Sequence, residues 1–71
     1  MSSLRIKFGK NLRRIRRQKD LTQEQLAEAT EISVEFLSNI ERGINAPSFE
    51  TLEKLSKVLG VPIKEFFEFD S

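Results

Sequence analysis

Residues 21–43 constrain the fold most, because their pattern predicts two short helices joined by a tight turn. Thr22 is followed three residues later by Gln25, which is the spacing of a capping box, so the first helix begins there. Ser33 is a favourable N-cap for the second helix, and Gly43 is the residue type that most often ends a helix in a left-handed conformation. Helices this short depend on packing against the rest of the chain.

Each of these two helices is expected to have a buried face and an outer face. Ala27 is expected on the buried side of the first helix, with Ala29 beside it, and its small size permits a close crossing. In the second helix, residues 34–42, Leu37 and Ile40 face inward at i, i+3 spacing. Its outer face is expected to carry Val34, Glu35, Ser38, Asn39 and Arg42. A helix with a polar outer face, held across another helix, is suited to present side chains to a DNA groove.

Short motifs recur in a fixed order along most of the chain. They are Leu21-Thr22-Gln23, Leu26-Ala27, Ile40-Glu41-Arg42-Gly43, Pro47-Ser48, Thr51-Leu52, Leu55 and Leu59-Gly60-Val61. Together they resemble the helix-turn-helix of phage-repressor and Cro-type DNA-binding domains, over roughly residues 4–67. The resemblance implies a repressor-like helical fold that binds duplex DNA. Among short relatives, the phenylalanine-rich ending slightly favours the controller proteins of restriction–modification systems over small phage-type repressors.

The first helix is predicted from the spacing of its apolar residues. These residues are Leu4, Phe8, Leu12 and Ile15. Successive members are four, four and three positions apart, which is the period of one helix face. Because a serine at position 2 or 3 can cap its start, we expect this helix to run from there to about residue 19.

A fourth helix is predicted at residues 49–59 and a last short helix at residues 63–67. The buried face of the fourth helix is expected to carry Phe49, Leu52, Leu55 and Leu59. Gly60 ends the fourth helix, and Pro62 suits the start of the last one. We therefore predict one all-α domain over residues 1–71, a compact five-helix, repressor-like fold with its helix-turn-helix motif at residues 22–43.

The composition excludes several classes of function. The 71 residues include no cysteine and no histidine, which removes disulfides, thiolate metal sites and the commonest general base. No convergent set of other reactive side chains is visible, so we expect no enzyme activity, cofactor, metal site or small-molecule ligand. No apolar run approaches the ~20 residues that span a bilayer. The start of the chain is also unlike a signal peptide, so we expect a cytoplasmic protein without membrane contact.

Positive and negative charges are divided unevenly along the chain. Residues 1–20 hold eight basic residues and one acid, a net charge of +7, whereas residues 21–71 hold four basic and ten acidic residues, a net charge of −6. The division predicts one basic face and one acidic face. Arg13 and Arg17 share a flank of the first helix, with Lys10 near them, and we expect this flank to contact DNA phosphates.

The outer face of the second motif helix is either an ordinary solvated surface or a surface that reads bases, and its place in the motif favours the second. Asn39 matches N6 and N7 of adenine, and Glu35 matches N4 of cytosine. Val34 suits a thymine methyl group, and Ser38 suits a base or a phosphate. Further DNA contacts are expected at Gln23, Ser33, Arg42 and Asn45.

Two features near the turn are implied by the family resemblance. The glutamine that begins the first motif helix, Gln23, either contacts a phosphate or braces the recognition helix. We favour the phosphate contact, because the free amides and the dipole of a helix start attract anions. The resemblance also implies a partly buried ion pair between Arg16 and Glu41, which would connect the first helix to the third.

Three phenylalanines lie within four residues near the end of the chain, and Phe66 is expected to fill the core. A symmetric dimer contact is predicted at Val61, Ile63, Phe67 and Phe69, with the final helix and tail, residues 62–71, taking part. A homodimer implies a pseudo-palindromic operator whose half-sites lie roughly 34 Å apart. The rival interpretations are an antitoxin that also binds a toxin, and a helical module that binds protein instead of DNA.

Overall fold

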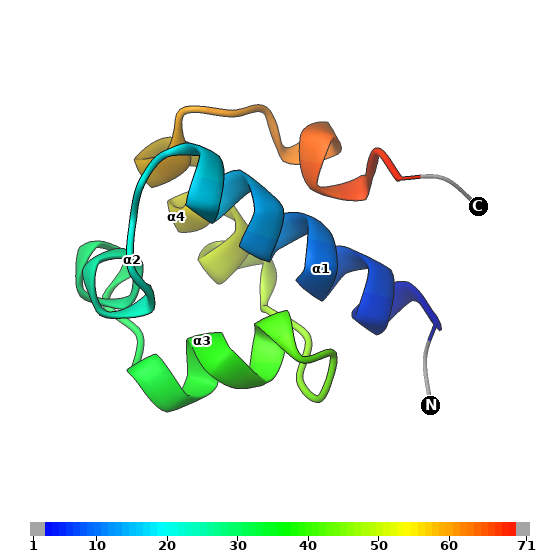
Figure 1. The fold of residues 1–71 in the computed structure, drawn as a ribbon, viewed down its shortest axis with the longest axis horizontal. Coiled ribbons are helices and arrows are strands. Elements are labelled where there is room, and N and C mark those ends of the chain that lie inside the picture. The colour runs from blue at the N-terminus through cyan, green and yellow to red at the C-terminus, as the bar shows by residue number, and fades with distance from the viewer. Residues whose placement is uncertain (1–2, 70–71) are drawn as a thin grey trace.

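The computed structural model describes residues 3–69, which form four α-helices and a final 3₁₀ segment (Figure 1). The elements are α1 (Ser3–Gln18), α2 (Gln23–Thr30), α3 (Val34–Glu41), α4 (Phe49–Leu59) and η1 (Ile63–Phe67). The all-helical prediction is confirmed for this part of the chain. The last short helix has the predicted bounds but is a 3₁₀ segment, because its bond from Glu65 N to Pro62 O spans three residues. The predicted count of five helices is therefore corrected to four α-helices and one 3₁₀ segment. Ser2 and tail residues 70–71 lie outside the described residues.

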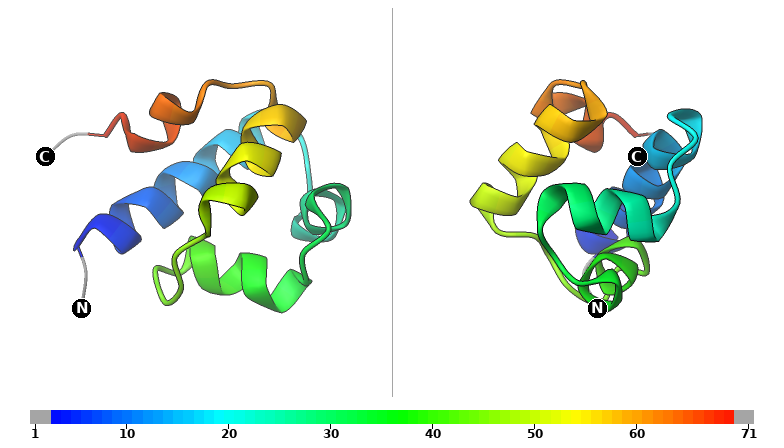
Figure 2. Two further views of the ribbon diagram at one scale, coloured as in Figure 1. Left: turned by 180° about the vertical axis from the view of Figure 1, so that it is seen from behind. Right: turned by 90° about the vertical axis from the view of Figure 1, so that its left-hand side faces the viewer.

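The helix α1 runs through the middle of the molecule, with α3 on one side of it and η1 on the other (Figure 1). The short helix α2 packs on both α3 and α4, and α4 also contacts η1 (Figure 2). The helices thus surround a single core, in a body measuring 30 × 22 × 21 Å. Only the inner side of α3 takes part in this packing, so its outer side faces solvent.

The capping residues act as the sequence predicts. The Thr22 hydroxyl accepts a hydrogen bond from Gln25 N at 3.1 Å, and Thr22 N donates to Gln25 Oε1 at 2.9 Å, which completes the capping box. The Ser33 hydroxyl accepts from Phe36 N at 3.0 Å at the start of α3. Gly43 follows α3 with a φ of +80°, in the left-handed region that glycine adopts without strain. These caps set where the two motif helices begin and where α3 ends.

The turn between α2 and α3 passes through a left-handed glutamate. Glu31 has a φ of 61°, a conformation that costs a non-glycine residue some free energy. Its N–H donates to Ala27 O and Glu28 O, and Ile32 N also donates to Ala27 O at 3.0 Å. These bonds close the end of α2 and redirect the chain, so that α3 starts within three residues at a steep angle to α2.

The core contains Phe8, Leu12, Ile15, Leu26, Ala27, Leu37, Ile40, Leu52, Leu55, Leu59, Val61 and Phe66. Three predicted core positions are wrong: Leu4 and Phe49 are 55% and 84% exposed, and Ala29 is also exposed. Leu4 and Phe49 both lie in the first turn of their helix. Next to Ala29, Thr30 takes the buried position, and its hydroxyl donates to Leu26 O at 2.7 Å.

Candidate nucleic-acid interface

The outer face of α3 is presented to solvent because Leu37 and Ile40 on its inner face are fully buried. The predicted base-reading residues all lie on this outer face. Val34, Glu35 and Arg42 are exposed, whereas Ser38 and Asn39 are half-buried. A short exposed helix that carries an amide, a carboxylate, a hydroxyl and an apolar side chain has the shape and the chemistry to read base edges in a major groove.

Ser33 and Asn45 lie at the two ends of α3. The Ser33 hydroxyl accepts the capping hydrogen bond from Phe36 N, and a hydroxyl that accepts one bond can still donate another. Asn45 is half-buried in the loop after α3, and its N–H donates to Asn39 O at 3.2 Å. The loop therefore folds back on the end of the helix, which holds Asn45 beside the outer face of α3.

An open depression lies where α1, the start of α2 and α3 meet. Its walls are formed by Arg13, Arg16, Arg17, Thr22, Gln23, Glu24, Ser38, Glu41 and Arg42. The depression brings together predicted contacts from three separate helices. Arg13 and Arg17 come from α1, Gln23 comes from α2, and Ser38 and Arg42 come from α3 and its cap. Exposed guanidinium groups beside a helix start form a surface that suits phosphate oxygens.

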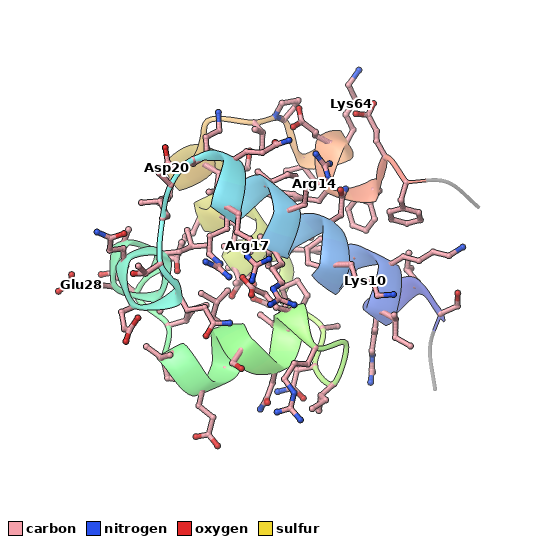
Figure 3. All side chains as sticks on the ribbon, in the orientation of Figure 1. Lys10, Arg14, Arg17, Asp20, Glu28 and Lys64 are labelled. Atoms are coloured by element: carbon pink, nitrogen blue, oxygen red, sulfur yellow. The ribbon has the colours of Figure 1, made fainter. Side chains whose placement is uncertain are left out.

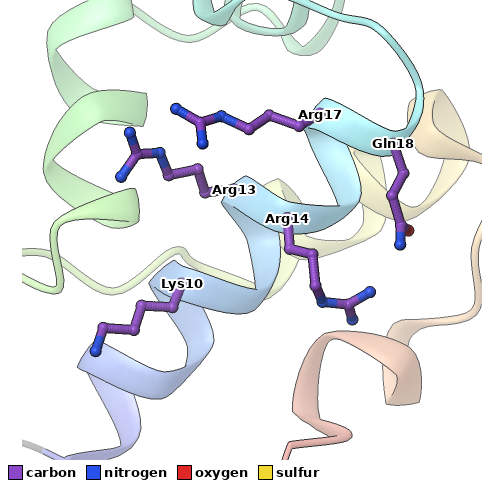
Figure 4. A pocket seen from close by; sticks show the side chains of 5 residues that line it. All are labelled: Lys10, Arg13, Arg14, Arg17 and Gln18. Atoms are coloured by element: carbon purple, nitrogen blue, oxygen red, sulfur yellow. The ribbon is translucent and has the colours of Figure 1, made fainter.

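The basic residues of α1 are divided between two sides of the helix. Arg13 and Arg17 extend toward α3, and Lys10 lies next to them (Figure 4). Arg14 points the other way, toward η1 (Figures 3 and 4). Its Nε donates to Oδ1 of Asn11, one turn earlier on α1, at 3.0 Å. The sequence already groups Arg13 and Arg17 on one flank of the first helix with Lys10 near them, and the fold turns this flank toward α3.

Arg16 and Glu41 form a two-pronged ion pair between α1 and the end of α3. Arg16 Nε lies 2.7 Å from Glu41 Oε2, and Arg16 Nη2 lies 3.1 Å from Glu41 Oε1. The two side chains are only 9% and 2% exposed, respectively. Arg16 Nη1 also donates to Leu21 O at 2.8 Å, and Gln23 Nε2 donates to Glu41 Oε1 at 3.0 Å. Of the two roles implied for Gln23, this geometry is that of the brace, because the amide points at the ion pair.

Asn11 is a polar residue of the core whose role the sequence pattern did not reveal. It is 6% exposed, and its Nδ2 donates to Glu65 O at 2.8 Å and to Phe66 O at 2.9 Å. These bonds hold η1 against α1 and give Phe66 O a hydrogen-bond partner, whereas Glu65 O also accepts from Glu68 N at 3.3 Å. The available signal was an uncharged polar residue beside Leu12 in the apolar stripe of a helix otherwise rich in charge.

The residues of the predicted dimer contact have different surroundings. Phe67 and Ile63 are 40% and 39% exposed. Phe69 is half-buried, with Lys7 Nζ 5.6 Å from the centre of its ring. Val61 is 9% exposed and belongs to the core of its own chain, so the inclusion of Val61 in the contact is corrected. A side chain already packed in the core offers little surface to a second protein.

Within the part of the chain that the structure describes, no group of three or more His, Cys, Asp or Glu side chains is arranged to hold a metal ion. No helix in that part is both long enough and apolar enough to cross a membrane.

A family model described as "Helix-turn-helix" matches residues 12–66. The chain is 38% identical over 69 residues to the control protein C.BamHI of Bacillus amyloliquefaciens, a match that covers 96% of this chain and 85% of that one. It is 37% identical over 68 residues to the control protein C.MunI of a Mycoplasma species, covering 94% and 92% of the two chains.

A solved structure with a closely similar fold is that of the restriction-modification controller protein C.AhdI from Aeromonas hydrophila. The superposition has a TM-score of 0.85 with 33% sequence identity, and it covers 89% of this chain and 96% of the other. The similarity extends over the motif, α1 and α4 together, because it spans most of both chains.

Proposed function

This chain belongs to the helix-turn-helix family, and from that premise we propose that it is a transcriptional regulator that binds duplex DNA sequence-specifically. The helix α3 enters the major groove, and the depression beside it receives the phosphates. Similarity to the control proteins C.BamHI and C.MunI, over nearly the whole of each chain, supports a controller of a restriction–modification system as the class of regulator. As part of the same proposal, the regulator acts in the cytoplasm.

The observation that carries this proposal is the position of the basic side chains relative to α3. Arg13 and Arg17 reach toward α3 from α1, and Arg42 extends the same surface from the cap of α3 (Figure 4). A protein that reads a groove needs cations beside the reading helix, because the phosphates of both strands flank the groove. The chain as a whole has a net charge of only +1, so the gathering of basic residues beside α3 does not simply reflect a basic protein.

We also propose that the regulator acts as a homodimer. Its 71 residues present one recognition helix, which can contact only a few base pairs, and two copies related by a two-fold axis would read a pseudo-palindrome. Half-sites roughly 34 Å apart would place both α3 helices on the same face of the duplex. The partners of the chain are therefore double-stranded DNA and a second copy of itself.

Selection of bound duplexes from a random library at about physiological ionic strength tests the proposed function. We expect enrichment of a palindrome with one fixed half-site spacing. Asn39→Ala should then cost about 1–3 kcal/mol of binding free energy and relax the preference at one base pair in each half-site, because a paired amide is lost. Glu53→Ala, an exposed change on α4, is the control and should leave both affinity and preference unchanged. Binding that enriches no sequence and disappears with salt would mean that α3 does not read bases.

Arg17→Ala and Arg14→Ala are a matched pair that separates the two sides of α1. Each removes one guanidinium, but only Arg17 lies in the depression beside α3. We expect Arg17→Ala to weaken binding to all duplexes and to reduce the slope of log affinity against log salt by about 1, because one phosphate contact is lost. Arg14→Ala should leave the slope unchanged. Equal slopes for the two variants in fluorescence-anisotropy titrations would contradict the assignment of phosphates to this depression.

A further inference from the structure

The outer surface of α1 carries an open recess of about 570 Å³ whose lining is almost entirely cationic (Figure 4). Its walls are formed by Lys10, Arg13, Arg14, Arg17 and Gln18, and we call it the outer recess. Arg13 and Arg17 extend from it toward α3, whereas Arg14 extends toward η1 (Figure 4). Among the described residues no carboxylate lines it, so four positive charges surround one open space.

The charges of the outer recess repel one another along the helix. Lys10 lies three and four positions before Arg13 and Arg14, and Arg17 lies four and three positions after them. Residues at these spacings are neighbours on a helix surface, and like charges there destabilise the helix. The side chains of Lys10, Arg13 and Arg17 make no hydrogen bond or ion pair with any residue that the structure describes. An anion held between them would remove this repulsion.

Arg14 is the member of the set that is held in place by the protein. Its Nε donates to Asn11 Oδ1 at 3.0 Å, and its Nη2 donates to the same oxygen. Asn11 is itself 6% exposed, and its Nδ2 is bonded to carbonyl groups of η1. The Nη1 of Arg14 remains available, because no described residue accepts a hydrogen bond from it. A guanidinium that is already held loses less entropy when it binds an anion.

We propose that the outer recess binds a chain of linked phosphate groups, supplied by an inorganic oligophosphate or by a nucleoside triphosphate. Guanidinium groups bond phosphate oxygens in pairs, and the Gln18 amide adds neutral donors. One phosphate group carries up to about two negative charges at pH 7, so linked phosphates are needed to match four cations. The recess is also many times larger than the roughly 30 Å³ of a water molecule, which suits a chain of phosphates. Such a site needs no reactive side chain, and for this reason the composition did not indicate a small-molecule ligand.

Two residues of the outer recess also belong to the depression beside α3, because Arg13 and Arg17 line both. In the proposed complex with DNA these guanidinium groups face operator phosphates, so they cannot serve both anions at once. A bound oligophosphate would also place negative charge beside the DNA strand. We therefore expect the ligand to weaken DNA binding, and DNA to weaken ligand binding by the same factor. This coupling rests on the proposed function, whereas the site itself does not.

Isothermal titration calorimetry of the full chain with sodium tripolyphosphate, at about physiological ionic strength and without Mg²⁺, tests the site. We expect one ligand per chain, with a dissociation constant below about 1 mM. Arg14→Ala should raise this constant at least about fivefold, because a charge-assisted hydrogen bond is lost. Lys10→Ala should also raise it, and this change removes no bond within the described protein, so a folding defect would not explain the loss. Lys57→Ala, which removes an exposed cation from α4, is the control and should leave the constant unchanged.

ATP and adenosine show which part of a ligand the outer recess recognises. We expect ATP to bind at least as tightly as tripolyphosphate and adenosine to give no binding heat, because only phosphate groups meet the cations. Equal affinities would identify the phosphate chain alone as the ligand, whereas tighter binding of ATP would identify a nucleoside triphosphate. The site would be overturned by adenosine binding as tightly as ATP, or by a tripolyphosphate dissociation constant above about 1 mM. Equal losses in Arg14→Ala and Lys57→Ala would also overturn it, since nonspecific ionic attraction predicts that result.

Fluorescence-anisotropy titrations with a duplex from the selection test the coupling. Tripolyphosphate at about ten times its dissociation constant should weaken DNA binding about fivefold or more, relative to NaCl of equal ionic strength. Arg14→Ala should bind DNA like the wild type without the ligand and should lose most of the ligand's effect. A DNA affinity that the ligand leaves unchanged would contradict the coupling. A chain that binds tripolyphosphate but enriches no DNA contradicts only the proposed function, whereas one that enriches DNA and binds no tripolyphosphate contradicts only the site.

Discussion

Arg16→Ala is expected to lower the free energy of unfolding by about 3–5 kcal/mol, because it leaves the Glu41 carboxylate buried without its cation. Glu41 is 2% exposed at its side chain, and both of its oxygens accept from Arg16. After the change only the Gln23 amide would remain as a partner. A domain of this length has a total stability of about 4–10 kcal/mol, so the variant should be close to unfolding at ambient temperature.

Urea denaturation of Arg16→Ala, Glu41→Ala and the double variant measures the coupling between the two side chains. We expect a coupling energy of at least about 1.5 kcal/mol, as for charged groups that share hydrogen bonds in the interior. Arg17→Ala is the control, because it removes the same charge from an exposed position on the same helix. Single-variant losses that simply add would show that Arg16 and Glu41 stabilise the fold independently.

Gly9→Ala is expected to destabilise the chain by about 3 kcal/mol, although alanine is the better helix former by about 1 kcal/mol. Gly9 lies where α1 crosses the end of α3. A Cβ atom at Gly9 would meet Ile40 O, and it would lie 2.6 Å from Glu41 O and 2.9 Å from the carbonyl carbon of Glu41. These are backbone atoms that cannot rotate away, so α1 and α3 would have to separate and the core around Ile40 would loosen.

Lys10→Ala is the matched control for Gly9→Ala, because Lys10 is exposed one position further along α1. Its stability should change by less than about 0.5 kcal/mol. Thermal and urea unfolding of both variants would show which of two opposing effects is larger, the higher helix propensity of alanine or the clash of its Cβ atom with the end of α3. A more stable Gly9→Ala chain would mean that helix propensity dominates and that the crossing of α1 and α3 tolerates a methyl group.

The local elements of this fold were predictable from sequence because their determinants lie within a few residues of one another. Thr22 and Gln25 satisfy each other's backbone groups across one turn, and Ser33 caps α3 in the same way. Gly43 ends α3 because its own conformation is left-handed. The outer face of α3 was predictable for the same reason, since helical periodicity alone separates it from Leu37.

Helical periodicity does not show which turns of a helix are covered by neighbouring elements, and two burial predictions were wrong for this reason. Phe49 has the spacing of a core residue, yet it is 84% exposed at the first position of α4. Leu4, at the start of α1, also has the spacing of a core residue and is also exposed. Asn11 has the opposite character, a polar residue that is buried because η1 supplies carbonyl groups from more than fifty residues away. A helix pattern contains no information about such distant partners.

The sequence by itself determined the positions of the helices, the side of α3 that faces outward and the family to which the chain belongs. Tertiary structure alone decided that Gln23 bonds to Glu41, that Arg17 lies beside α3 while Arg14 turns to Asn11, and that Phe49 lines a surface groove. The physical reason is the range of the interactions. Caps and helix faces depend on residues three or four positions apart, whereas these contacts depend on how separate helices cross, which the packing of the whole core sets.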